Sequence, residues 1–60
     1  MRELIAVLRG ITPAEVAAVG DAVLTAGFDR IEVTLNSPDP LASIAILVRE
    51  FGSSAMVGAG

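Results

Sequence analysis

Two kinds of hydrophobic pattern alternate along the chain. A continuous apolar run, Leu4–Leu8, comes first, and after Thr12 the apolar residues recur every three or four positions instead. Short continuous apolar runs are typical of parallel strands buried on both faces, whereas the wider spacing is typical of one face of a helix. The opening of the chain therefore predicts a strand followed by a helix.

The first predicted helix has clear start and stop signals. Thr12 is a hydroxyl N-cap, Pro13 occupies the first helical position, and Glu15 stands three residues after the cap, as in a capping box. Gly27 stands where a left-handed residue commonly ends a helix. The predicted buried stripe of this helix consists of Val16, Val19, Val23 and Ala26.

The same order of signals then repeats. Ile31–Leu35 predicts a second strand, Ser37 and Pro38 predict a second capped helix start, and Gly52 predicts its end. Ala55–Val57 predicts the opening of a third strand. The predicted buried stripe of the second helix consists of Leu41, Ile44, Val48 and Phe51.

The repeat has a constant length and indicates the fold class. Thr12 and Ser37 are 25 residues apart, and so are Gly27 and Gly52. Strands that alternate with helices pair in parallel through right-handed crossovers, so the chain is predicted to be α/β. Eight such units need about 200 residues, the lower end of the range for a (β/α)₈ TIM barrel. A doubly wound sheet fits this much pattern equally well.

Glu32 is the residue that favours the barrel. It shares one face of the second predicted strand with Thr34, while the apolar residues of that strand occupy the other face. Helices cover both faces of a doubly wound sheet, where a mid-strand carboxylate would be costly, whereas the mouth of a barrel accommodates it. Glu32 is thus a candidate proton donor and acceptor. The structural alternative is that Glu32 serves as a counter-ion to Arg9 on the adjacent strand.

Composition excludes several classes of protein. The chain has 60 residues, 53% of them hydrophobic and 18% charged, which suits a piece of a larger α/β protein. It contains no cysteine and no histidine, so disulfides and the usual zinc sites are not expected. A formal charge of −3 and only two aromatic residues argue against a nucleic-acid partner. Without an apolar run of about 20 residues or a signal-peptide pattern, we expect no membrane partner and a cytoplasmic location.

Three motifs together resemble a known family over essentially the whole chain. They are Leu8–Pro13, Ile31–Pro38 and Gly58–Gly60. In them the chain looks like the N-terminal part of a single barrel domain, residues 1–60 and incomplete, of the 2-keto-3-deoxy-6-phosphogluconate and phosphogalactonate aldolases. The segment Leu35–Pro38 resembles the 2-dehydro-3-deoxy-6-phosphogalactonate branch.

The resemblance implies a fold, a reaction and two site residues. It implies a (β/α)₈ barrel, assembled as a homotrimer, that cleaves a keto-deoxy sugar acid phosphate into pyruvate and glyceraldehyde 3-phosphate. The implied lyase chemistry is class I, through a lysine Schiff base, with no metal or other cofactor. Arg9 matches the substrate-binding arginine, and Glu32 matches the catalytic acid–base residue, which also contacts substrate. Because the 60 residues contain no lysine, the chain alone is expected to be inactive.

Two other functions stay open from the residues alone. The alternative is a non-catalytic βαβ fragment or assembly module, in which Arg9 is a charge at a strand end. Gly58 and Gly60 could instead open a dinucleotide-binding fingerprint of a doubly wound domain. That fingerprint needs a third glycine and a following helix.

Overall fold

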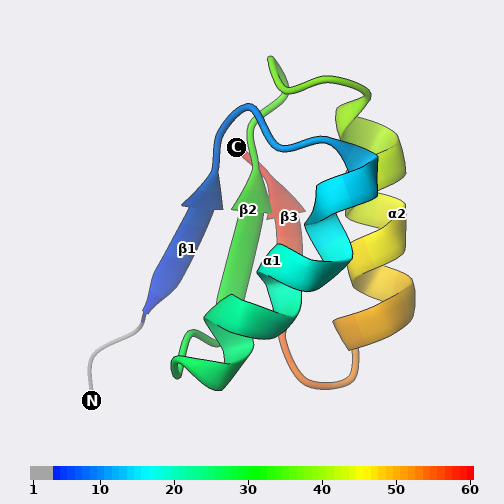
Figure 1. Ribbon diagram of the computed structural model, residues 1–60. Coiled ribbons are helices and arrows are strands. Elements are labelled where there is room, and N and C mark those ends of the chain that lie inside the picture. Colours follow the sequence, from blue (N-terminus) through cyan, green and yellow to red (C-terminus); the bar gives the residue numbers. More distant parts are fainter. Residues whose placement is uncertain (1–3) are drawn as a thin grey trace.

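Three strands and two helices follow one another in β-α-β-α-β order in the computed structural model, which describes residues 4–60 (Figure 1). The elements are β1 (Ile5–Leu8), α1 (Pro13–Thr25), β2 (Arg30–Val33), α2 (Pro40–Phe51) and β3 (Met56–Ala59). The strands form one parallel sheet in the order β1-β2-β3. The predicted α/β class and strand order along the chain are confirmed, with strand bounds that differ by one or two residues.

Both helices pack against the same face of the sheet and against each other (Figure 1). The fully buried core consists of Val16 from α1, Leu47 from α2, and Ile31 and Val33 from β2. Gly20 of α1 lies where the helices meet, and a Cβ atom built there would be 2.8 Å from a methyl carbon of Leu47. The missing side chain at this position therefore lets the two helices approach closely.

The first helix begins as the sequence predicts. The backbone N–H of Thr12 donates to Glu15 Oε1 at 3.1 Å, and the Thr12 hydroxyl donates to the same atom at 2.8 Å. Both bonds lower the pKa of Glu15 below its ordinary value of 4.5, and the bond from the hydroxyl has the larger effect. The helix ends at Thr25, and Gly27 has a φ of +105°, which confirms the predicted left-handed stop.

The second helix begins two residues later than predicted. Its first residue is Pro40, preceded by Asp39 at the N-cap position. Pro38 and Pro40 both suit the first position of a helix, so the sequence signal was ambiguous. The predicted cap, Ser37, is buried in the preceding loop, where its hydroxyl accepts a hydrogen bond from the backbone N–H of Gly10 at 2.9 Å. A hydroxyl committed to another loop does not cap the helix.

The predicted buried stripes are correct only in part. On α2, Leu41 and Val48 are 71% and 52% exposed, while Ser43 and Leu47 are fully buried. This helix is apolar around most of its circumference, so a three-to-four spacing can be drawn along more than one side. On α1, Ala26 follows the last helical residue and is exposed. The remaining predicted positions are buried or half-buried: Val16, Val19, Val23, Ile44 and Phe51.

No element of the described part of the chain covers the face of the sheet away from the helices. Alternation along the strands places Ile5, Val7 and Met56 on it, and these side chains are 41%, 52% and 64% exposed. Among the described residues β1 and β3 each pair with β2 alone, so both are edge strands of this sheet. Within residues 4–60, neither helix has the length and apolar character needed to cross a membrane.

We expect the isolated 60-residue chain to associate with itself instead of forming a stable monomer. An open apolar sheet face with two unpaired edges favours pairing with other chains. Sedimentation velocity over a range of concentrations should show oligomers, and Val7→Lys should reduce association more than the helix-surface control Ala18→Lys does. A concentration-independent monomer with a cooperative thermal transition would contradict this expectation.

Candidate active site

The two predicted site residues, Arg9 and Glu32, lie at one end of the sheet together with Gly60. Arg9 directly follows β1, Glu32 is the third residue of β2, and Gly60 directly follows β3. In the parallel register Glu32 lies between Val7 and Gly58. Active sites of α/β barrels are built at this end of the strands.

The Glu32 carboxylate lies on the helix-free face between two neighbours. Its Oε2 atom is 3.5 Å from Nε of Arg30, which stands two residues earlier on the same strand, and the Glu32 side chain is 26% exposed. Its Oε1 atom faces Gly60, where an added Cβ atom would lie only 3.3 Å away. One carboxylate oxygen is therefore directed at a guanidinium and the other at the carboxyl end of β3.

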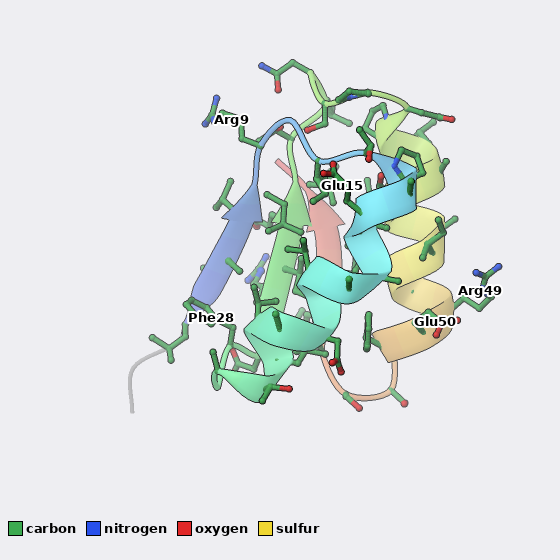
Figure 2. The ribbon with its side chains drawn as sticks, viewed as in Figure 1. Arg9, Glu15, Phe28, Arg49 and Glu50 are labelled. Carbon is green, nitrogen blue, oxygen red and sulfur yellow. The ribbon has the colours of Figure 1, made fainter. Side chains whose placement is uncertain are left out.

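Arg9 is exposed, and its side chain points away from the sheet (Figure 2). Within residues 4–60, the ion pair of Glu32 is made with Arg30 and not with Arg9. The structural alternative, in which Glu32 is the counter-ion of Arg9, is therefore wrong. The substrate-binding role predicted for Arg9 stays a prediction.

Two buried hydroxyl groups join the loops at this end of the sheet. Thr34 Oγ1 and Ser37 Oγ are 2.8 Å apart, and Ser37 Oγ accepts the hydrogen bond from Gly10. The backbone N–H of Thr34 donates to the carbonyl of Leu8 at 3.1 Å, and Thr34 Oγ1 lies 3.5 Å from that oxygen. Sequence analysis missed this contact, because no local signal pairs residues that are 26 and 27 positions apart.

The opposite end of the strands holds a cavity of about 360 Å³. It is lined by Asp29, Arg30 and residues 52–56. It lies at the amino-terminal ends of β2 and β3, away from Gly60 and the loop that carries Arg9. Among the described residues no three potential metal-ligating side chains come together, at either end of the sheet.

The elements are arranged as in part of a (β/α)₈ barrel. Three parallel strands lie in sequential order, with the helices on one face of the sheet and a carboxylate on the other. No family model matches the chain. The 2-dehydro-3-deoxy-6-phosphogalactonate aldolase of Escherichia coli (strain K12) is 53% identical over 57 residues, which cover 95% of this chain and 28% of the relative. The probable 2-dehydro-3-deoxy-6-phosphogalactonate aldolase of Rhizobium meliloti (strain 1021) is 46% identical over 59 residues, 98% of this chain and 28% of the relative.

Solved structures give the same result. A structure described as native KDPGal superposes with a TM-score of 0.92 at 53% identity, over 95% of this chain and 28% of that one. A cube-shaped, highly porous protein cage designed by fusing symmetric oligomeric domains gives a TM-score of 0.94 at 52% identity, over 97% of this chain and 22% of that one. The chain therefore represents a segment of the 2-dehydro-3-deoxy-6-phosphogalactonate aldolase family, and it spans 28% of the length of these curated relatives. The matches give no support to the nucleotide-binding alternative.

Gly60 and Gly58 provide a matched pair of substitutions for testing the site. The test needs a full-length chimera, in which this chain replaces the matched segment of the Escherichia coli relative. Gly60→Ala should crowd Glu32 Oε1 and lower the kcat of the chimera, measured with the substrate of the Escherichia coli relative, about tenfold. A displacement of about 1 Å in an active site lowers the reaction rate by up to about 10²-fold. Gly58→Ala, where no described atom lies within 4 Å of the added Cβ, should leave kcat unchanged. Equal effects of the two substitutions in steady-state assays would contradict the placement of Glu32.

Proposed function

We propose that the protein to which this segment belongs is a class I aldolase that cleaves 2-dehydro-3-deoxy-6-phosphogalactonate into pyruvate and glyceraldehyde 3-phosphate. The observation that carries the proposal is the position of Glu32, on the helix-free face near the carboxyl end of the central strand. The names of the matched relatives support the choice of substrate. In this proposal residues 1–60 form the N-terminal part of one barrel domain.

Glu32 moves protons in the proposed reaction. A lysine from outside these 60 residues forms an iminium with the substrate ketone, and the iminium accepts the electrons of the breaking carbon–carbon bond. Forming and hydrolysing the preceding carbinolamine requires a group that both gives and takes a proton. The Oε1 atom, which faces Gly60, is the oxygen directed toward the end of the strands where substrate binds.

Arg9 binds an anionic group of the substrate. Its guanidinium presents a planar fork of donors that suits a carboxylate or a phosphate. It stands on the loop directly after β1, at the same end of the sheet as Glu32, and it is exposed. The substrate thus spans from Arg9 to the Glu32 carboxylate, and both residues contact it.

The assembly and location follow from the same proposal. We propose a homotrimer, supported by the match to a cage designed from symmetric oligomeric domains. A substrate that carries a carboxylate and a phosphate does not cross a membrane unaided, because moving charges into an apolar layer is costly. We further propose that the reaction takes place in the cytoplasm, on a small-molecule substrate, without a nucleic-acid or membrane partner.

Glu32→Gln in the chimera tests the catalytic role. The amide keeps the shape of the side chain but does not cycle a proton, so kcat should fall about 10²–10⁴-fold while KM changes much less. The matched control is Glu50→Gln on the outer surface of α2, since Glu50 is also paired with an arginine, Arg49, at 3.4 Å (Figure 2). Near wild-type turnover of Glu32→Gln would favour the alternative of a βαβ segment without a catalytic role.

The isolated chain should form no covalent adduct with a ketone. Incubation with pyruvate and borohydride reduces and traps a Schiff base on a lysine, and these 60 residues contain none. Arginine does not substitute, because its guanidinium stays protonated. Mass spectrometry should show no stoichiometric adduct for the chain, whose primary amine is the α-amino group of Met1, and one pyruvate-derived adduct for the chimera. Stoichiometric trapping on the isolated chain would show that the chemistry lies elsewhere.

A further inference from the structure

We propose that Thr34 and Ser37 form a hydroxyl clamp, a pair of buried side chains that holds Arg9 in position relative to Glu32. The proposal rests on the proposed function, because that function gives Arg9 and Glu32 their roles. Neither hydroxyl touches the substrate in this proposal. Both are positioning residues that act through the backbone on either side of Arg9.

The two hydroxyl groups form hydrogen bonds with the backbone of both neighbours of Arg9. On one side the Thr34 hydroxyl donates to the carbonyl of Leu8 at 3.5 Å, beside the backbone bond of 3.1 Å that the Thr34 N–H makes to the same oxygen. On the other side the N–H of Gly10 donates to Ser37 Oγ at 2.9 Å. Arg9 is thus the single residue between two anchored positions, although its own side chain is exposed.

The hydrogen bonds have one consistent direction. The Leu8 carbonyl only accepts, so Thr34 donates its hydroxyl proton to it, and Ser37 in turn donates to Thr34 Oγ1 across 2.8 Å. Ser37 Oγ completes the series by accepting from Gly10. Each hydroxyl therefore donates once and accepts once, which explains how both residues are buried, at 7% and 5% exposure, without an unpaired group.

The clamp joins the two parts of the proposed site. Thr34 directly follows β2, the strand that carries the Glu32 carboxylate, and Ser37 belongs to the loop between β2 and α2. Gly10, with a φ of +76°, belongs to the loop that carries Arg9. An exposed arginine on a glycine-containing loop has many available orientations, and anchoring its backbone lowers the entropy cost of binding substrate.

Substitutions at the clamp in the chimera test the proposal. Thr34→Val removes the hydroxyl at nearly constant shape and Ser37→Ala removes the other. Each substitution removes two of these hydrogen bonds and should raise KM about 5- to 10-fold, because only the part of their energy that positions Arg9 enters substrate binding, and each should change kcat much less. Thr34→Ser restores the hydroxyl and should restore KM. Thr25→Val, at the exposed last residue of α1, is the matched control and should change neither constant.

A double-mutant cycle separates positioning from general stability. If the clamp acts through Arg9, Thr34→Val should raise KM in the parent chimera but add nothing in an Arg9→Gln background. Additive effects would overturn the proposal while leaving the proposed function intact. Unchanged KM in Arg9→Gln itself would instead contradict the proposed substrate-binding role, and the clamp proposal with it.

Hydrogen exchange gives a readout that does not depend on activity. The Gly10 amide is bonded to Ser37 Oγ, so Ser37→Ala should speed its exchange, whereas Ser53→Ala, on the exposed turn before β3, should not. Unchanged exchange in Ser37→Ala would overturn the clamp. Faster exchange with unchanged KM would reduce the two hydroxyls to a structural contact. A chimera without aldolase activity would count against the proposed function.

Discussion

The alternation of side chains along β2 is the constraint on which the rest of the structure depends. The side chains of Ile31 and Val33 point to the helices and are completely buried. Because side chains alternate along a strand, the residue between Ile31 and Val33 must point to the other face of the sheet. That residue is Glu32. The burial of two aliphatic side chains thus fixes where the carboxylate stands. A shift of one residue in the strand register would bury the charge and expose the core, so the register is strongly specified.

Local signals in the sequence predicted the elements that depend on local interactions. The Thr12–Glu15 pair needs only residues three apart, and in the structure the backbone N–H and the hydroxyl of Thr12 both donate to Glu15 Oε1. The repeat of strands and helices follows from hydrophobic spacing, which also survives without tertiary information. The placement of Glu32 opposite the core residues follows from period-two alternation. For Leu35 the same alternation was extended too far, since β2 ends at Val33 and Leu35 is 58% exposed.

The errors arose where tertiary contacts override local preference. Serine is a favourable N-cap residue, yet the hydroxyl of Ser37 accepts a hydrogen bond from the backbone N–H of Gly10, 27 residues away. The helix consequently begins after Asp39, and a different side of α2 faces the core. For the candidate site, the sequence identified Glu32 and Arg9 through residue type and motif. It could not identify Arg30 as the ion-pair partner of Glu32, because several arrangements of two arginines around one carboxylate are compatible with the same sequence.

The fully buried Ser43 of α2 has a thermodynamic consequence. Its hydroxyl oxygen has no hydrogen-bond partner among residues 4–60, and an unpaired buried hydroxyl costs roughly 1–3 kcal/mol. An alanine would occupy the same place without that cost. Stability of this helix–sheet layer therefore does not explain the serine. The serine therefore lowers the stability of the layer by that amount, and other favourable interactions have to offset the cost in the native state.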